Sequence, residues 1–388
     1  MVGSFPMSLE SFVINPSINV SPYCYSILRI EPYSGCGHRC IYCFGRWYRV
    51  ESAEGSRAEP NVARDFKRTL NSLRKRSLKT MPFRLSTLVD PFQPIEEKRR
   101  VSKHVMAMCL KHSAPLIINT KATLLLRNDL FSILMELNSR GLVIVQISLS
   151  TINAKIASLL EPNAPPPIER LNMAEKLSEK NVPVIVRLQP FIPGITDCEA
   201  EDIVKHSRYA GVKQLIVEAL RDDVENMKIY EELAYEKSAY SNLGSWLSYS
   251  PSVEVSSKIV RPSIEWRLKA YMKTKSLCEK YGLEFSTCKE GFYSYHTAKN
   301  CCGMHYLEDG SYLLRPTLHE VWMYREKYNV IPSFEELAAS LTDSYLFGDR
   351  IRRYPRALRR KVLSHEKILR EILGEKWDMI KTLLIDRF

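Results

Sequence analysis

Short runs of aliphatic and β-branched residues alternate with amphipathic stretches through the first two thirds of this chain. Runs such as LVIVQISL and VPVIVRL are almost continuously apolar, which is typical of parallel strands covered on both faces. We expect strands at 25–30, 84–89, 115–119, 143–149, 183–188 and 214–218. Most of them begin about 30 to 40 residues apart, the length of a strand, a loop and a helix. The pattern predicts an α/β fold of six βα units in a curved, incompletely closed barrel.

The intervening stretches set the expected domain organisation. Helical spacing occurs at 64–76, 96–111, 128–138, 168–180 and 198–210. After about residue 220 the alternation gives way to a polar, partly helical region. We therefore expect an N-terminal extension at 1–24, a barrel at 25–262 and a mostly α-helical C-terminal extension at 263–388.

Composition excludes several classes of protein. With 45% hydrophobic residues in a chain of 388, a sizeable core can be buried, and a disordered chain is excluded. No run approaches the roughly 20 apolar residues that span a bilayer, and the first residues, MVGSFPMSLESF, lack the features of a signal peptide. We expect a cytoplasmic protein with no membrane partner. The formal net charge of +12 favours anionic partners without choosing among them.

The ten cysteines are expected to serve metal binding or catalysis, because disulfides are rare in a reducing compartment. The segment EPYSGCGHRCIYCFGR places Cys36, Cys40 and Cys43 in a C-x3-C-x2-C spacing directly after the first expected strand. Three thiolates can hold an iron–sulfur cubane and leave one iron open. The alternative is a tetrahedral zinc site with His38 as fourth ligand. A position after a barrel strand, where such folds place their chemistry, favours the cluster.

This loop resembles the signature of the radical S-adenosylmethionine (SAM) enzymes, including the aromatic Tyr42 before the third cysteine. The resemblance implies a [4Fe–4S] cluster on the three cysteines, with SAM bound to the open iron and its adenine near the Tyr42 backbone. It further implies reductive cleavage of SAM to a 5′-deoxyadenosyl radical that abstracts hydrogen from a substrate. An electron donor of the flavodoxin or ferredoxin kind is then an expected partner.

More of the chain is similar to the spore photoproduct lyase-like group, also labelled DNA repair photolyase. The similar blocks are TLVDPFQPIE, INTKATLLLRNDL, ISLST, LEPNAPPPIERL and PFIPGITD, in that group's order. The resemblance covers about residues 25 to 200 and implies a partial (β/α)6 TIM-type barrel of the radical SAM kind. It also implies an open side that admits a large substrate.

Several polar residues near the expected strand ends are candidates for SAM binding. Asp90, with Glu96 as runner-up, has a carboxylate suited to the methionine ammonium, and Lys121 has an ammonium suited to the methionine carboxylate. Ser148 is similar to a cofactor-binding serine of the resembled lyase. The remaining candidates are Arg187 and Gln189, which end the fifth strand; a buried arginine there requires an anionic partner, either substrate or cofactor.

Two further features of the barrel region have alternative interpretations. Glu161 and Arg170 could form a structural ion pair, or Glu161 could face the ribose of SAM. In spore photoproduct lyase a cysteine near the end of the second strand donates a hydrogen atom, whereas the similar block here has Thr87 or a neighbour. Cys198 is a candidate replacement, although a lone cysteine at a helix start is usually a small packing residue.

A second cysteine group, Cys288, Cys301 and Cys302, lies beyond the expected barrel. A second iron–sulfur cluster, a zinc ion and a set of buried thiols are all compatible with it. Basic stretches at 64–79 and 350–370 are either solvated helix faces or phosphate-binding rims.

Three functions follow as hypotheses. The first is a radical SAM enzyme that repairs or modifies a base of DNA or RNA. The second is a radical SAM enzyme that acts on a peptide or a small metabolite. The third is a non-catalytic, metal-stabilised nucleic-acid-binding protein.

Overall fold

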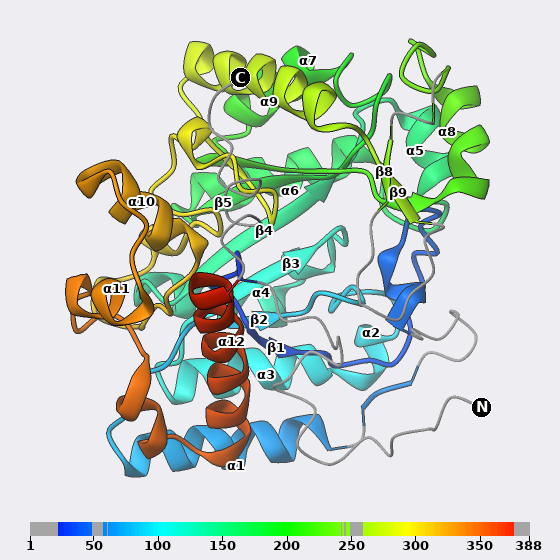
Figure 1. The fold of residues 1–388 in the computed structure, drawn as a ribbon. Helices are drawn as coiled ribbons and strands as arrows, with labels where there is room; N and C mark the ends of the chain where they lie inside the picture. Colours follow the sequence, from blue (N-terminus) through cyan, green and yellow to red (C-terminus); the bar gives the residue numbers. More distant parts are fainter. Residues whose placement is uncertain are drawn as a thin grey trace, which may run out of the picture.

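Seven parallel strands form one curved sheet in the computed structural model, which describes residues 22–48, 57–59, 61–241, 243, 246–248 and 259–375 (Figure 1). Their order is β1-β2-β3-β4-β5-β6-β10, so neighbours in the sheet are also neighbours along the chain until the last strand. The strands are β1 (Leu28–Ile30), β2 (Phe83–Leu85), β3 (Leu116–Thr120), β4 (Val143–Leu149), β5 (Val184–Phe191), β6 (Gln214–Ala219) and β10 (Glu284–Thr287). The expected α/β partial barrel is confirmed.

The seventh strand was not predicted. Glu284–Thr287 has the sequence EFST, which is short and half polar, and it lies in the region that we expected to be helical. It pairs in parallel with β6, Phe285 opposite Leu215, so the sheet continues past the predicted barrel boundary at residue 262. The barrel thus has one βα unit more than the six that the sequence pattern indicated.

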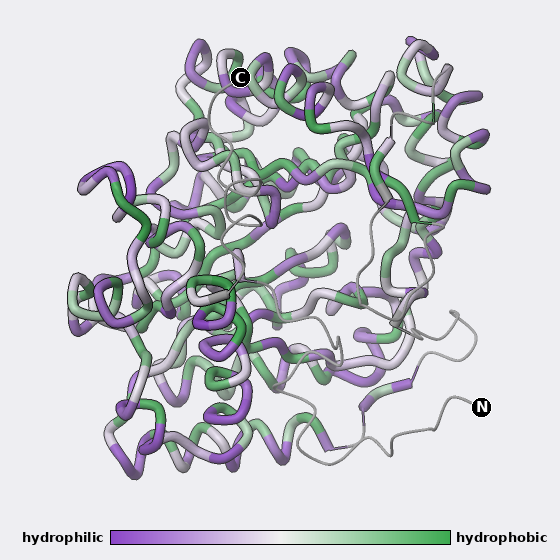
Figure 2. The backbone as a smooth tube through the Cα atoms, viewed as in Figure 1, coloured by the Kyte–Doolittle hydropathy of each residue, from purple (hydrophilic) through white to green (hydrophobic). Residues whose placement is uncertain are grey.

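Helices cover the outer face of the sheet, as the sequence pattern predicted. The barrel helices are α1 (Val62–Lys75), α2 (Glu96–Arg99), α3 (Val101–Lys111), α4 (Asn128–Ser139), α5 (Ala154–Leu160), α6 (Pro167–Glu179), α7 (Ala200–Tyr209) and α9 (Ile264–Tyr281). The single helix expected at 96–111 is interrupted at Arg100, whose φ of 55° is left-handed. In Figure 2 the strands are mostly hydrophobic and the outer turns of the helices mostly hydrophilic.

The inner face of the barrel is built in two levels. Side chains alternate across a strand, so residues two apart face the same way. The lower level holds four buried isoleucines, one from each of four strands, Ile117, Ile144, Ile185 and Ile216, together with the buried amide of Gln214. The inward positions two residues further along are polar, as with Gln146 after Ile144 and Arg187 after Ile185. The upper half of the barrel is therefore polar and can house chemistry.

Residues 298–307 close the lower end of the barrel. Cys301, Cys302 and Met304 are buried against the four isoleucines. Gly303 lies so close to Ile185 that a Cβ atom there would be 2.1 Å from Ile185 Cδ1, and its φ is +72°. This tight approach fixes the cysteine pair beneath the polar level.

The chain between β6 and α9 forms a small side sheet. Its strands are β7 (Asp222–Asp223), β8 (Leu247–Ser248) and β9 (Ile259–Arg261), in the antiparallel order β7-β9-β8, beside α8 (Met227–Leu233). This sheet lies next to the loop after β1: Arg46 from that loop forms an ion pair with Asp222.

The C-terminal part is helical, as expected. It consists of α10 (Leu318–Tyr328), α11 (Phe334–Ser340) and α12 (Arg356–Glu375). Glu320 and Glu336 complete capping boxes at the starts of α10 and α11. The N-terminal extension predicted at 1–24 lies outside the described residues except for its last three. No helix in the described part of the chain is long and apolar enough to cross a membrane.

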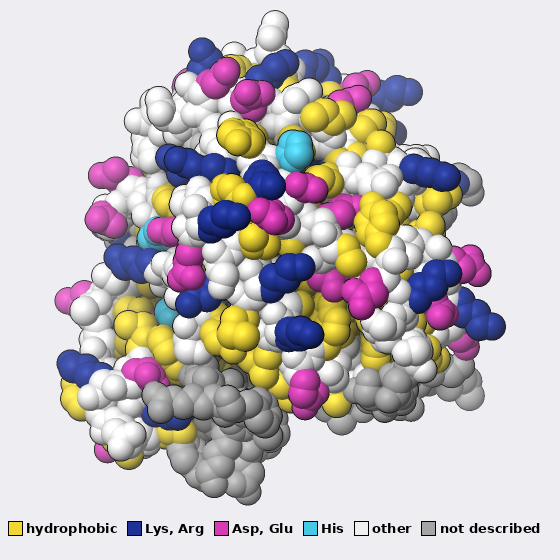
Figure 3. Space-filling view, turned by 90° about the horizontal axis from the view of Figure 1, so that it is seen from above, with side chains coloured by type: hydrophobic (Ala, Val, Ile, Leu, Met, Phe, Trp, Pro, Cys, Tyr) yellow, Lys and Arg dark blue, Asp and Glu magenta, His cyan; other side chains and the backbone are white. Residues whose placement is uncertain are grey.

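The face that carries α7 and α9 is shown in Figure 3. Positive and negative side chains are interspersed there, with hydrophobic ones between them. The net positive charge of the chain is not gathered on this face.

Candidate active site

One cavity collects most of the residues that the sequence singled out. It lies at the C-terminal ends of the strands and is lined by the cysteine loop, the ends of β2 to β6 and the segment after β10. Its lining includes Cys36, Cys40, Cys43, Tyr42, Asp90, Lys121, Ser148, Arg187, Gln189, Cys288 and Cys302. Active sites of barrel enzymes lie at this end, because the loops there are free to vary.

The amide side chains of two residues outside the cysteine loop form hydrogen bonds with the backbone of the loop. Gln93 accepts a hydrogen bond from the Gly37 amide at 2.7 Å and donates one to the Gly35 carbonyl at 2.7 Å. Asn163 donates to the Gly37 carbonyl at 2.9 Å. These contacts fix the backbone around the first cysteine without using its sulfur.

His38 and Asp90 form a buried pair beside this loop. His38 Nε2 lies 3.4 Å from Asp90 Oδ2, and His38 Nδ1 lies 3.1 Å from the Asn163 carbonyl. Asp90 also accepts hydrogen bonds from the Lys121 amide at 2.6 Å and the Thr120 hydroxyl at 2.8 Å. Burial alone would raise the pKa of Asp90, but His38 and the backbone donors outweigh it and lower the pKa. The contacts of Asp90 thus link the segment after β2 to the end of β3 and to the cysteine loop.

Glu161 is the centre of a second buried network. Its carboxylate forms an ion pair with Arg170, accepts a hydrogen bond from the Tyr42 hydroxyl, and lies 3.6 Å from Lys121 Nζ. Burial would raise the pKa of Glu161, but the charges of Lys121 and Arg170 outweigh it and lower the pKa to about 2. The structural ion pair considered for Glu161 and Arg170 is therefore present. Glu161 also holds the Tyr42 hydroxyl, and Tyr42 lines the cavity.

The three loop cysteines are partly buried thiols that line one cavity. Burial raises the pKa of Cys36 to about 12, aided by the charge of Asp90, and burial raises that of Cys40 as well. Both pKa values are also raised by the charge of Cys43, so the three thiols lie within electrostatic reach of one another. Within the described ranges, however, no three His, Cys, Asp or Glu side chains are arranged to hold one metal ion. A cubane needs thiolates that surround a larger body, and its iron atoms would compensate their buried charge.

Two buried arginines form the floor of the cavity. Arg84 donates to Asn119 Oδ1 at 2.6 Å, to Gln146 Oε1 at 2.7 Å and to Cys302 Sγ at 3.4 Å. Arg187 donates to the same Gln146 oxygen at 3.2 Å and to Cys288 Sγ at 3.3 Å. The second cysteine group therefore belongs to the same site as the loop cysteines, although it lies more than 240 residues later in the chain.

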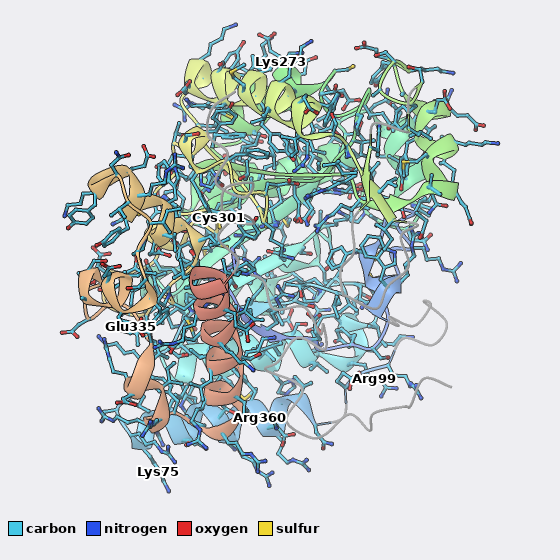
Figure 4. The ribbon with its side chains drawn as sticks, in the orientation of Figure 1. Lys75, Arg99, Lys273, Cys301, Glu335 and Arg360 are labelled. Atoms are coloured by element: carbon cyan, nitrogen blue, oxygen red, sulfur yellow. The ribbon has the colours of Figure 1, made fainter. Side chains whose placement is uncertain are left out.

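The thiols of this floor differ in ionisation. Cys301 and Cys302 have their sulfur atoms 3.8 Å apart. The hydrogen bond from Cys301 and the positive charges of Arg84 and Arg187 lower the pKa of Cys302. Figure 4 marks Cys301 in the interior, between the sheet and α10, whereas Lys273 on α9 and Lys75 on α1 lie at the periphery. Cys302 is thus placed to be the counter-ion of two buried guanidinium groups.

Some sequence-predicted residues lie elsewhere. Glu96 is fully buried under the start of α3, where its carboxylate accepts hydrogen bonds from the Ser102 amide at 3.0 Å and the Lys103 amide at 2.9 Å. Cys198 is exposed and does not line the cavity. Thr87, in the block where the resembled lyase has its hydrogen donor, does line it and donates to Glu31 Oε1 at 2.7 Å.

Sequence reasoning did not single out four basic residues of the cavity. They are Arg29 on β1, Arg84 on β2, Arg221 after β6 and Lys289 after β10. A signal existed for the first two, since a charged residue within an apolar barrel strand must face the interior or pair with something. Nothing local marks Lys289, because β10 itself was not predicted.

The chain was also compared with known proteins. Residues 30–206 match the model of the radical SAM superfamily. A protein of Acidianus two-tailed virus is 31% identical over 159 residues, which cover 39% of this chain and 50% of the viral protein. A Mycobacterium tuberculosis protein is 27% identical over 190 residues, covering 47% of this chain and 54% of its own length. Both are described as uncharacterised, and the chain spans about half the length of these relatives.

Among solved structures, spore photoproduct lyase has a similar fold. One structure, of a cysteine-to-alanine variant, has a TM-score of 0.55 at 13% identity and covers 73% of this chain and 79% of the lyase. Another, of such a variant with the dinucleoside spore photoproduct, has a TM-score of 0.54 at 12% identity, with the same shares covered. At this identity the likeness concerns the fold alone.

Proposed function

We propose that the protein is a radical SAM enzyme that acts on a base of a nucleic acid, because residues 30–206 match the model of the radical SAM superfamily. The superfamily implies a [4Fe–4S] cluster and SAM; when bound, they supply a 5′-deoxyadenosyl radical that removes a hydrogen atom from the substrate. One observation carries the proposal: the three loop cysteines share a cavity at the C-terminal end of the barrel with Lys121, Ser148 and Arg187.

Each part of the cavity has its own role in this proposal. Cys36, Cys40 and Cys43 hold the cluster. Lys121, which lies 5.4 Å from the centre of the Tyr42 ring, binds the methionine carboxylate of SAM. The Tyr42 backbone and Ser148 contact the rest of the cofactor.

Asp90 takes a different role from the one its sequence position suggested. Its carboxylate already accepts the Lys121 amide, the Thr120 hydroxyl and the Phe92 amide. Asp90 Oδ2, which accepts the Lys121 amide, also lies beside His38 Nε2. A contact between Asp90 and the methionine ammonium would therefore use an oxygen that already has these two neighbours. We propose that Asp90 mainly positions Lys121 and the cysteine loop, and contacts SAM at most through this one oxygen.

The proposed substrate class rests on charge and on fold. Six basic side chains line the cavity, Arg29, Arg84, Lys121, Arg187, Arg221 and Lys289, against the carboxylates Asp90 and Glu218. Such an excess favours an anionic substrate, and the similarly folded lyase is solved with a dinucleoside lesion. An electron donor of the flavodoxin or ferredoxin kind completes the proposed set of partners.

The test is anaerobic reconstitution with iron and sulfide, followed by dithionite and SAM. We expect about four irons per chain and formation of 5′-deoxyadenosine. Cys40→Ala should abolish both, whereas Cys198→Ala, a change at an exposed cysteine outside the cavity, should keep the iron content. Iron binding without any 5′-deoxyadenosine would refute the enzymatic proposal and favour a metal-stabilised binding protein.

The iron count also tests whether the second cysteine group binds a cluster. A further cluster or zinc ion on Cys288, Cys301 and Cys302 would have to replace the hydrogen bonds that Arg84 and Arg187 donate to the sulfurs. About eight irons per chain would support a second cluster. That result would favour chemistry on a peptide or metabolite, in which the second cluster anchors the substrate.

A further inference from the structure

The barrel is open between its two edge strands. The sheet runs from β1 to β10, and these two strands are not paired with each other in the described part of the chain. Arg29 lies on β1, Lys289 follows β10, and Arg221 follows the neighbouring β6. All three line the cavity, so positive charge flanks the opening on both sides.

Two of these cations lack an acceptor. Arg221 forms an ion pair with Glu218, and on the far side of the cavity Lys121 is satisfied by Glu161. Arg29 Nε is buried without a hydrogen-bond partner, and Lys289 forms no hydrogen bond or ion pair with another described residue. Burial lowers the pKa of Lys289, as do the positive charges of Arg29 and Arg221, so the three groups lie within electrostatic reach of one another.

The surroundings add further positive charge, while the Cys288 and Cys24 thiols act in the opposite direction on the pKa of Lys289. Lys361 of α12 is buried near Arg29; burial and the charge of Arg29 lower its pKa to about 8. The next residue in the chain, Glu290, has a buried carboxylate, but it forms ion pairs with Arg267 and Arg261. Arg29 and Lys289 are half-buried, and unpaired cations that have lost part of their water are costly unless a ligand supplies the missing charge.

We propose that Arg29, Arg221 and Lys289 bind a phosphate group of the substrate in the opening between β1 and β10. A guanidinium group presents paired donors that match phosphate oxygens, and a lysine ammonium adds a point charge. A phosphate held there lies in the same cavity as the loop cysteines. The inference rests on the proposed function and deepens it, because it names the group by which a nucleotide substrate is recognised.

Phosphate can come from a free nucleotide or from a nucleic-acid chain, and the experiment separates the two. The reconstituted enzyme with SAM bound is titrated anaerobically into three fluorescent probes: a nucleoside monophosphate, a single-stranded DNA hexamer and the same hexamer with uncharged methylphosphonate linkages. Anisotropy gives the Kd of each probe. We expect the methylphosphonate hexamer to bind at least about tenfold more weakly than the phosphodiester hexamer.

Variants assign the effect to the opening. Lys289→Gln and Arg29→Gln should each raise, about tenfold, the Kd of whichever phosphate-containing probe binds the wild type more tightly. Each should also reduce the slope of log K against the logarithm of the salt concentration by about one. The matched control is Lys176→Gln, the same change at an exposed lysine of α6 outside the cavity, and it should leave Kd unchanged. Lys289→Arg keeps the charge and should bind within a few-fold of the wild type, which covers the case in which Lys289→Gln does not fold.

Each result is decisive. Equal affinity for charged and uncharged hexamers, or unchanged Kd in both glutamine variants, overturns the phosphate site. Tighter binding of the monophosphate than of the hexamer would support the phosphate site and identify a free nucleotide as its ligand. Formation of 5′-deoxyadenosine is measured separately in the same samples, so loss of phosphate binding with intact SAM cleavage refutes only this inference. Phosphate binding without SAM cleavage refutes only the proposed chemistry.

Discussion

The Glu161–Arg170 pair allows a quantitative test of how the cavity is held in shape. Both side chains are almost completely buried, with 1% exposure each. The change Arg170→Met keeps much of the side-chain volume and removes one of the two positive charges that compensate Glu161, the other being Lys121. It also leaves the Pro165 carbonyl, 2.8 Å from Arg170 Nε, without its donor.

The expected cost follows from the pKa of Glu161. A pKa lowered from 4.5 to about 2 corresponds to about 3 kcal/mol of stabilisation of the folded protein at neutral pH, which Lys121, Arg170 and the Tyr42 hydroxyl supply together. Removal of one partner from a buried ion pair costs about 3 to 5 kcal/mol, in agreement with this value. Arg170→Met should therefore lower the free energy of unfolding by about 3 to 5 kcal/mol.

The assay is urea unfolding followed by circular dichroism near pH 7 and near pH 4. Because the folded pKa of Glu161 is depressed, the pair stabilises the protein above the unfolded pKa of 4.5 and loses this effect as the pH falls toward 2. The cost of Arg170→Met should shrink at the lower pH, where the unpaired carboxyl of the variant takes up a proton. Arg208→Met, at an exposed arginine of α7, is the matched control and should cost less than about 0.5 kcal/mol.

A double variant refines the test. Glu161→Gln combined with Arg170→Met removes the unpaired charge, so the double variant should be more stable than Arg170→Met alone. If the double variant loses the sum of the two single costs, or if Arg170→Met unfolds like the wild type, the buried pair does not organise this site as argued.

Two further predictions concern the floor of the barrel. Gly303→Ala should lower the free energy of unfolding in urea by about 3 kcal/mol or more, because the φ of Gly303 is +72° and the new Cβ would lie 2.1 Å from Ile185. The control Gly282→Ala, where φ is +74° and no atom lies within 4 Å of the new Cβ, should cost only about 1 kcal/mol. Equal costs for the two variants would contradict the packing argument. Cys302 should be a thiolate at neutral pH, because its folded pKa is lowered and the ionised form is lost only as the pH falls through that value. The ultraviolet thiolate absorbance of the cluster-free protein should therefore fall in Cys302→Ser. It should not fall in Cys278→Ser, because burial raises the pKa of the Cys278 thiol and keeps it protonated. An unchanged absorbance in Cys302→Ser would contradict the thiolate.

The sequence could predict those parts of the site that are encoded locally. Cys36, Cys40 and Cys43 lie within eight residues, so their spacing alone indicates one shared ligand. Lys121 and Arg187 were found because each stands at the end of an apolar run, and the ends of parallel strands meet at one edge. Glu96, the runner-up to Asp90, is also near a strand end, but in the structure its carboxylate accepts hydrogen bonds from the first turn of the helix that follows.

Contacts between distant segments could not be predicted in the same way. Arg84 reaches Cys302 across 218 positions of sequence, and no periodicity in either segment records that contact. β10 has only four residues and became a strand because β6 offered it an unpaired edge.

The sequence by itself determined the alternation of strands and helices and the cysteine loop, because both depend on residues that are neighbours along the chain. Only the tertiary structure decided that Cys288 and Cys302 share the cavity of the loop cysteines, and that Arg29 and Lys289 lie on the two edges of its opening. The physical reason is that burial and charge compensation are properties of a place in the fold. They become defined only when the barrel brings its first and last strands around the same space.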